Sequence, residues 1–371
     1  MIGHQQAAAI EAKYAEQRGS LRHRRELAPV VDAATIASLA ATAFWTSLRR
    51  EEGRTPKLSL AYLPPEAAEG AFRFDRPLAM DPDVLIRLGP AVERSGIHVG
   101  VWRGDDGYVA WGIVRELPDV CVVLEVFEPG LLAFKYSRDE VLGKFGNVAV
   151  LNGDEVNIVD ESFTERPSCP SVLTSLVSFD PGRLWHSEGS VFVRLAASMR
   201  AHGHGGILLV VPTGDDAWRD SIAWPAPYAA VPAFTRLADV TPRSLLAERD
   251  HERELALLRA IDAVAGFTAV DGATVLDRHH DVLAFGAMIT PVTKGRTVER
   301  VRLTEPVRGN VSAIVEVGAV GNARHRSAAQ FVQDQHDALA LVASQDGRFT
   351  AFAWSEPDHL VHAYRIDALL L

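Results

Sequence analysis

Residues 271–276 read Asp-Gly-Ala-Thr-Val-Leu, and residues 324–326 read Arg-His-Arg. The first stretch joins an apolar helical segment, residues 255–264, to a strand-like run. The second opens a helical segment directly after a loop that contains a glycine. A carboxylate in one loop, with two guanidinium groups and an imidazole at a helix start, suits a metal-bound triphosphate. These two stretches are therefore the main basis for predicting the function of the C-terminal half.

Alternating apolar residues predict antiparallel hairpins around these loops. The expected strand pairs are 273–276 with 282–288, 298–303 with 311–317, and 338–343 with 349–354. An amphipathic helix is predicted over 191–201, before a buried strand over 207–211. A second helix is predicted over 243–264, with Thr241 as its N-cap. This half is therefore expected to be a mixed sheet with flanking helices.

The N-terminal half shows the same mixture of elements. Helix-forming residues fill 6–17 and 33–48, and from residue 98 the apolar period changes to two. The expected hairpins pair 98–102 with 108–114, 121–127 with 131–136, and 147–151 with 155–159. Prolines and a glycine break regular structure over 160–182. We predict an α+β, mixed α/β fold of two domains, 1–165 and 183–371.

The composition limits the classes of function. The chain has 371 residues, a net charge of −10 and a pI near 5.7, so a broad basic surface for nucleic acid is not expected. Two cysteines, Cys121 and Cys169, are too few for a disulfide framework or a cysteine-based zinc site. The N-terminus lacks a signal-peptide pattern, and no apolar run reaches the roughly 18 residues of a membrane helix. We expect a soluble, cytoplasmic protein with neither nucleic acid nor a membrane as partner.

Each of the two motifs also has an ordinary structural interpretation. Gly272 allows close backbone approach and Asp271 offers the oxygen ligand that Mg²⁺ or Mn²⁺ prefers, but an Asp-Gly turn before a strand is usually structural. Arg324, His325 and Arg326 stand where amides and arginines can bind phosphate, although a solvated basic cluster is more common. The order of the two motifs and of the elements around them carries more information than either motif alone.

Two histidine pairs outside these motifs are interpreted as structural. His202 and His204 flank a glycine at a helix end, and no third ligand lies at metal-binding spacing. His279 and His280 fall in the turn of a predicted hairpin, so both are expected to be exposed to solvent. The first pair is therefore not expected to bind a metal, whereas contact of the second pair with a ligand stays open because the turn is near the two motifs.

Taken in this order, the elements resemble the diadenylate cyclase domain of the bacterial and archaeal cyclic di-AMP synthases. That family carries an Asp-Gly-Ala loop, a hairpin, and a Gly-Thr-Arg-His-Arg loop that opens a helix. A strand that ends in an acidic turn follows. In this chain the resemblance runs over residues 191–354, with Ser344-Gln345-Asp346 at the acidic turn. The C-terminal domain is therefore expected to have the diadenylate cyclase fold.

The resemblance implies that two ATP molecules condense into cyclic di-AMP and pyrophosphate across a head-to-head interface between two self-associated subunits. It implies catalytic roles for Asp271, Arg324, His325 and Arg326, with Asp271 also binding Mg²⁺ or Mn²⁺ as the cofactor. It implies nucleotide contacts for Gly272, Ala273, Gly321, Asn322, Ala323 and Ser344. The N-terminal domain, residues 1–165, would then be a sensor or regulatory domain.

Two alternatives remain open at this point. The same fold could bind ATP or a cyclic nucleotide as a sensor with little or no turnover. Val270, Ala323 and Gln345 differ from the family's pattern and favour that alternative. The long segment between the two motifs would also allow a cyclase with a different cyclic nucleotide as its product.

Overall fold

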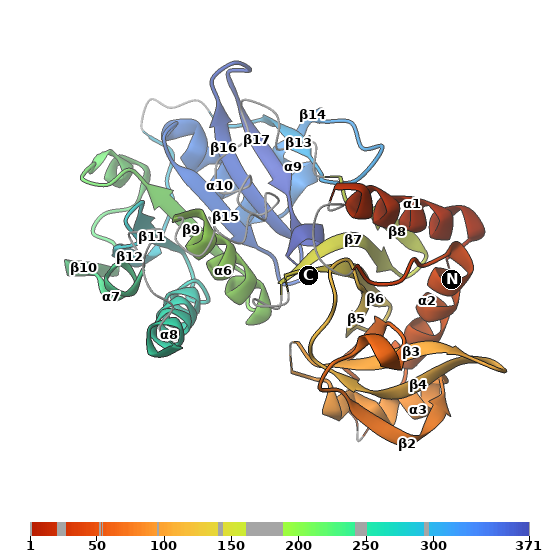
Figure 1. Cartoon of the computed structure of the whole chain (residues 1–371). Helices are drawn as coiled ribbons and strands as arrows, with labels where there is room; N and C mark the ends of the chain where they lie inside the picture. Colours follow the sequence, from red (N-terminus) through yellow and green to blue (C-terminus); the bar gives the residue numbers. More distant parts are fainter. Residues whose placement is uncertain are drawn as a thin grey trace. The chain divides into compact units, whose positions relative to one another are not determined.

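The structure is a computed structural model that describes residues 2–20, 27–51, 53, 55–94, 96–139, 144–160, 188–241, 251–292 and 297–370. The chain divides into two compact units between Val159 and Asp160. Each unit contains its own sheet (Figure 1). The predicted fold class is confirmed, because each unit is a mixed sheet with flanking helices. Most of the segment predicted to join the domains lies outside the described residues.

The described part of the N-terminal unit forms an eight-stranded sheet with the order β2-β4-β3-β1-β5-β6-β7-β8. The strands are β1 (Leu58–Tyr62), β2 (Phe72–Ala79), β3 (His98–Gly104), β4 (Gly107–Val114), β5 (Val122–Glu128), β6 (Leu131–Asp139), β7 (Lys144–Asn152) and β8 (Glu155–Ile158). β1 runs parallel to β3 and antiparallel to β5. The three predicted hairpins are confirmed as β3–β4, β5–β6 and β7–β8.

Helices α1 (His4–Ser20), α2 (Ala33–Ser47) and α3 (Pro82–Leu88) accompany this sheet, with short 3₁₀ turns η1 (Pro65–Ala67) and η2 (Gly89–Ala91). The apolar side chains Ile10 and Ile36 of the first two helices belong to the same core as Leu60 and Phe134 of the sheet. All four are essentially inaccessible to solvent, so burial of one helical face holds the helices to the sheet. The helices predicted over 6–17 and 33–48 are confirmed.

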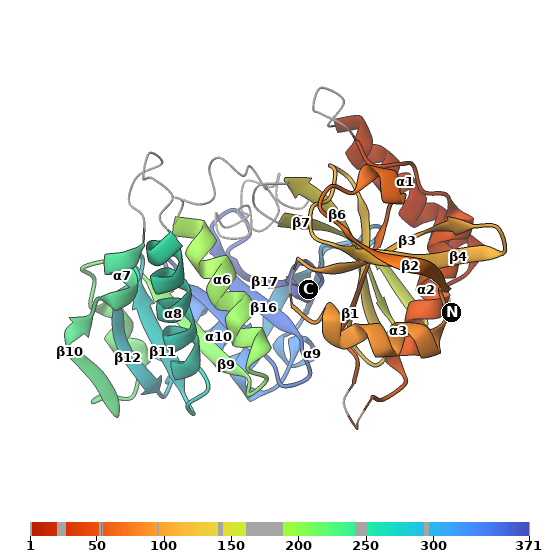
Figure 2. The ribbon, with the colours of Figure 1, turned by 60° about the horizontal axis from the view of Figure 1, so that its bottom comes forward.

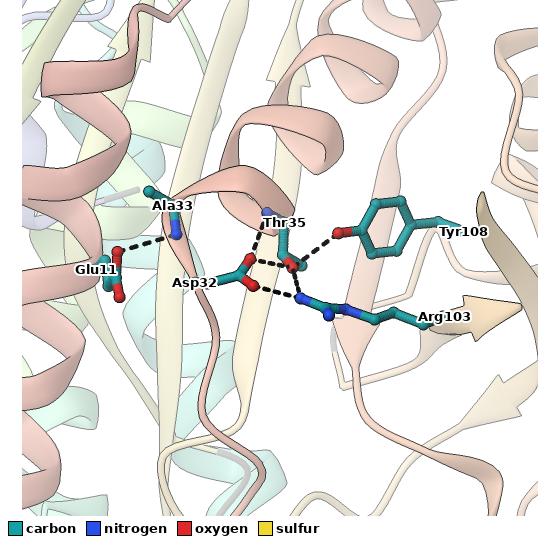
Figure 3. Close-up of polar contacts among 6 residues, drawn as sticks. All are labelled: Glu11, Asp32, Ala33, Thr35, Arg103 and Tyr108. Carbon is teal, nitrogen blue, oxygen red and sulfur yellow. Dashed lines mark hydrogen bonds and ion pairs between the residues drawn. The ribbon is translucent and has the colours of Figure 1, made fainter.

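Asp32 caps α2 and also connects it to the β3–β4 hairpin (Figure 3). Its Oδ1 accepts hydrogen bonds from the backbone N–H of Thr35 at 2.7 Å and from the Thr35 hydroxyl at 2.6 Å. Its Oδ2 pairs with the guanidinium of Arg103, and Tyr108 donates its hydroxyl to Thr35 Oγ1 at 2.8 Å. The hydrogen bonds from Thr35, the side-chain one first, lower the pKa of Asp32 from 3.8 to about 2.

Replacing Asp32 with alanine is expected to lower the free energy of unfolding by about 1–2 kcal/mol, because the helix cap is lost. The folded pKa lies below the unfolded one, so the contribution of the carboxylate is present above the unfolded value of 3.8 and is lost as the pH falls toward about 2. Urea unfolding of wild type and Asp32→Ala at about pH 7 and about pH 3 measures this. The difference between them should shrink at the lower pH, and an unchanged difference would contradict the assignment.

The described part of the C-terminal unit forms a nine-stranded sheet with the order β10-β12-β11-β9-β15-β16-β17-β13-β14. The strands are β9 (Gly206–Val211), β10 (Tyr228–Phe234), β11 (Ala273–Asp277), β12 (Val282–Ala287), β13 (Arg300–Thr304), β14 (Ala313–Glu316), β15 (Leu339–Ala343), β16 (Phe349–Ser355) and β17 (Leu360–Arg365). β9 runs parallel to β11 and antiparallel to β15. The predicted hairpins are confirmed as β11–β12, β13–β14 and β15–β16.

Helices cover both faces of this sheet. They are α6 (Glu188–Ala201), α7 (Arg236–Val240), α8 (His251–Phe267), α9 (Val317–Val320) and α10 (Ala323–Asp334), with 3₁₀ turns η4 (Ala217–Ser221) and η5 (Asp367–Leu369). Figure 2 shows α6 and α8 side by side on one face. Along β9, Leu208 and Val210 belong to the core with α6 and α8, whereas Ile207 and Leu209 belong to the core with α10. Burial on both faces explains the uninterrupted apolar run of β9.

Some elements differ from the expectation. The sequence patterns do not predict strands β1, β2, β10 and β17, nor helices α3, α7 and α9. Thr241 is the C-cap of α7, and its hydroxyl donates to the carbonyl oxygen of Leu237 at 2.7 Å. Its expected role as the N-cap of the next helix stays a prediction, because residues 242–250 lie outside the described part of the chain. The first residues of the helix predicted over 243–264 lie outside the described part of the chain. No helix among the described residues is both long enough and apolar enough to cross a membrane.

Candidate functional site

The candidate site lies at one edge of the C-terminal sheet, where three neighbouring strands begin or end. β11 runs parallel to β9, so both strands begin at this edge. β15 runs antiparallel to β9, so it ends there. The loop before β11 carries Asp271 and Gly272, and the turn after β15 carries Ser344. The strand order therefore gathers segments that are far apart in the sequence.

The backbone conformation and the close neighbours of residue 272 require a glycine at this position. Its φ of +101° is a backbone conformation that L side chains rarely adopt. A Cβ at this position would lie 2.5 Å from the carbonyl carbon of Gly286 in β12. The loop therefore crosses β12 in direct backbone contact. Asp271, one residue earlier, is exposed, so its carboxylate is accessible to a ligand.

An aromatic stack lies beside this crossing. Phe285 stacks on Tyr228 at a centroid distance of 4.6 Å and on Phe267 at 4.8 Å. A Cβ on Gly286 would lie 2.8 Å from the Tyr228 ring and 3.5 Å from the carbonyl oxygen of Asp271, so the ring lies close to the loop. Tyr228 is 51% exposed. It presents a flat surface on which a nucleobase could stack.

Arg324 brings the second motif to the same edge. Its backbone N–H donates to Oδ1 of Asn322, the N-cap of α10, at 3.2 Å. Its Nη1 atom lies 3.0 Å from the place that a Cβ on Gly205 would occupy, and Gly205 directly precedes β9. Neighbouring strands are about 4.8 Å apart, so the start of β9 and the start of β11 are close. The fold thus brings the Arg324 guanidinium and the Asp271 loop to the same edge of the sheet.

His325 differs from the role implied by the resemblance. It is 2% exposed and its ring meets that of Phe352 at a centroid distance of 6.2 Å. Burial lowers the pKa of His325 to about 4, and Arg365 acts in the same direction, so the imidazole is neutral at physiological pH. A Cβ on Gly321 would lie 2.3 Å from Nδ1 of His325, so Gly321 leaves room for the ring. His325 therefore packs beneath the loop before α10 and offers no positive charge to a phosphate.

The other predicted residues surround these groups. Ala323 and Arg326 are exposed in the first turn of α10. Ser344 opens a tight turn, and its N–H donates to the carbonyl oxygen of Arg348 at 2.8 Å. Burial acts to raise the pKa of Asp346 in this turn, but hydrogen bonds from Ser344 and from the Arg348 backbone outweigh it and lower the pKa. The turn thus keeps a charged carboxylate near the site.

Gln345 ties this turn to the loop before β9. Its amide donates to the carbonyl oxygen of His204 at 3.2 Å. In the same loop, His202 accepts the N–H of His204 at its Nδ1, and its Nε2 lies 3.1 Å from the Thr268 hydroxyl. Both ring nitrogens of His202 therefore have partners within the protein, which supports the structural interpretation.

His280 is not exposed as the turn pattern predicts. It is 1% exposed, has a φ of +72° and packs its ring 4.9 Å from that of Phe192. Its neighbour His279 is exposed, as expected. The prediction misses His280 because side-chain burial in a turn depends on the helix that packs over it.

A metal ion at this edge of the sheet would have the Asp271 carboxylate as a protein ligand. Among the described residues, there is no group of three or more His, Cys, Asp or Glu side chains that could hold a metal ion. Mg²⁺ is commonly bound through one or two carboxylates plus substrate phosphates, without a complete protein cage. The exposed carboxylate of Asp271 fits that arrangement. The predicted Mg²⁺ or Mn²⁺ ion would therefore complete its shell with phosphate oxygens and water.

Comparisons with known proteins give information on part of the chain. A family model described as "Probable sensor domain DACNV" matches residues 25–115, which lie in the N-terminal unit. A crystal structure of a hypothetical membrane spanning protein from Bacillus cereus matches at 15% identity over 52% of this chain and 71% of that chain, with a TM-score of 0.27. No curated protein shows significant similarity to the chain. The family match supports the expected sensor domain in the N-terminal unit.

Proposed function

We propose that the C-terminal unit condenses two ATP molecules into cyclic di-AMP and that the N-terminal unit regulates this reaction as a sensor. The observation that carries the proposal is the meeting of two loops at one sheet edge. Arg324 lies against Gly205 at the start of β9, and the Asp271 loop enters the neighbouring strand β11. The DACNV match supports the regulatory half, because such sensor domains are usually linked to diadenylate cyclases.

The residues at this edge divide the work of binding. Arg324 and Arg326 would bind the phosphates, together with the free amides at the N-terminus of α10. The backbone of Gly272 and Ala273 would line the nucleotide, and Tyr228 would stack on the base. Asp271 would hold Mg²⁺ or Mn²⁺, which supplies positive charge to the phosphates. His325 would act through packing, because it holds the loop that presents Arg324.

The reaction requires that the two nucleotides are correctly positioned and that negative charge on the leaving group is stabilised. The 3′-hydroxyl oxygen of one ATP attacks the α-phosphorus of the other; a new O–P bond forms while the bond to pyrophosphate breaks, and the hydroxyl proton passes to solvent. Two such steps close the ring and release two pyrophosphates. Arginines and helix amides stabilise the negative charge that builds up on the leaving group. A second copy of the chain would supply the second ATP, so the proposal includes self-association.

The test is to incubate the purified full-length protein with ATP and Mg²⁺ or Mn²⁺ and to separate the nucleotides by chromatography. We expect cyclic di-AMP and pyrophosphate, with a rate that rises more steeply than the protein concentration because two subunits must meet. A parallel incubation with GTP tests the choice of nucleotide. ATP binding without any cyclic product at high protein concentration would contradict the cyclase, and absence of binding would contradict the whole site.

A second candidate is a sensor that binds the nucleotide with little or no turnover. Gln345 favours it, because this residue stands within the expected acidic turn and its amide is engaged with His204. Ala323 and Val270 also lack the polar side chains of the family's pattern. Tight binding of ATP or cyclic di-AMP without turnover would support this candidate.

A further inference from the structure

A cavity of about 310 Å³ opens beside α1 in the N-terminal unit. Residues of α1 between Glu11 and Gly19 form one wall, and Leu27, Val31 and Val122 contribute to an apolar floor. The volume is about twice that of an engineered cavity of about 150 Å³ that binds benzene. The cavity is therefore large enough for a small organic molecule with an apolar body.

Arg18 supplies positive charge to this cavity. One guanidinium nitrogen, Nη1, donates to the carbonyl oxygen of Ala28. That bond holds the side chain in place, and no other described residue takes a hydrogen bond from the remaining donors of the guanidinium. Arg18 forms no ion pair with a described residue of the chain. A guanidinium that is fixed in place but has no ion-pair partner among the described residues can bind the carboxylate of a ligand through two parallel hydrogen bonds.

Glu11 supplies the opposite charge. It is seven residues from Arg18 on α1, which places the two backbones about 10 Å apart on the same side of the helix. Its Oε2 accepts the backbone N–H of Ala33 at 3.0 Å (Figure 3). Among the described residues, no cation pairs with it. A ligand with a second anionic group at this end would be repelled, so the two charges together select against dicarboxylates.

The surface between the two charges is apolar. Tyr14 lines the cavity, but its hydroxyl already donates to the carbonyl oxygen of Lys135 at 2.7 Å, so its ring is what faces a ligand. Val30 also lines the cavity and is 70% exposed. A bound apolar chain would cover this valine and remove its surface from water.

We infer that this cavity is the ligand site of the sensor unit and that its ligand is a small amphipathic monocarboxylate. The carboxylate binds Arg18, and the apolar body lies along Val30, Val31 and Val122 toward Glu11. Because Glu11 also accepts the first amide N–H of α2, a ligand here contacts a side chain that is hydrogen-bonded to the helix that Asp32 connects to the β3–β4 hairpin. The inference concerns the N-terminal unit and does not require the C-terminal unit to be a cyclase.

Isothermal titration calorimetry of the full-length protein with octanoate tests the inference, with octylamine and the dicarboxylate suberate as matched probes. We expect octanoate to bind and the other two to bind at least about 10-fold more weakly, the size of one charge-assisted hydrogen bond. Arg18→Ala should weaken octanoate by about 10- to 100-fold. Arg76→Ala, which removes an arginine that is 91% exposed on β2, should leave the affinity unchanged.

A second variant keeps the test independent of Arg18. Ala15 is exposed on α1 and lines the cavity, so Ala15→Trp should fill the space without disturbing the core and should abolish octanoate binding. Three results would each overturn the inference. They are equal affinity of the wild type for octanoate and octylamine, no binding of octanoate to the wild type, and wild-type affinity of folded Arg18→Ala for octanoate. Cyclic di-AMP synthesis is measured separately, so failure of the cyclase and failure of this site give different results.

Discussion

Asparagine in place of Asp271 is expected to lower the rate of cyclic di-AMP synthesis by at least about 100-fold, because the nucleotide and its metal lose the carboxylate that positions them. The substitution changes charge with almost no change in size. Asp271 is exposed, so the fold and the melting temperature should stay the same. Initial rates by chromatography, together with a thermal melt, measure both quantities on the same preparation.

Asp337 offers a matched control for this substitution. It is also an exposed aspartate, and it precedes β15 at the opposite edge of the same sheet, where Leu339 pairs with Val210. Asp337→Asn should therefore synthesise cyclic di-AMP at the wild-type rate. Equal rates of synthesis for the two variants would show that Asp271 does not contribute to the reaction. A lower melting temperature for Asp271→Asn alone would show that Asp271 has a structural role.

Alanine in place of Gly272 is expected to destabilise the C-terminal unit by about 2–5 kcal/mol. A left-handed backbone costs an L residue about 1–2 kcal/mol, and overpacking typically adds about 1–3 kcal/mol. Both terms apply here, because φ is +101° and the new Cβ would lie 2.5 Å from the Gly286 backbone. Two backbones in contact cannot separate without disturbing the β11–β12 pairing. Calorimetric melting of the full-length protein measures the loss.

Gly266 provides the comparison for this prediction. It lies in α8, and a Cβ there would meet nothing within 4 Å. Gly266→Ala should therefore be neutral or should stabilise by up to about 1 kcal/mol, since alanine favours helix. If both glycine substitutions change stability equally, the close approach at Gly272 is not the cause.

The local patterns predicted the regular elements of this protein well where the signal was periodic. All six expected hairpins are present, because alternating side chains and a turn are encoded within one short stretch. β1 was missed for the opposite reason. Its five residues are all buried, so the strand has no polar face to mark its period, and Ser59 interrupts the kind of continuous apolar run that marks the fully buried strand β9.

The candidate site was only partly predictable. The Asp271 loop and the Arg324 helix start could be selected from composition and position. Gly205, Gly286 and Tyr228 carry no comparable signal, because their importance comes from backbone and side-chain contacts with distant segments. The burial of His325 and its lowered pKa could not be predicted, since no local pattern reveals the ring of Phe352 beside it.

Composition and periodicity were therefore sufficient for the fold class, for most strands and helices, and for the two loops that could meet a phosphate. Those properties are local, since they depend on neighbours within one turn or one hairpin. The tertiary structure alone decided that Asp271 and Arg324 share an edge, that His325 is neutral and that α1 borders a cavity with two opposite charges. Each of these depends on strand order and on helix placement, which bring together residues that no local pattern relates.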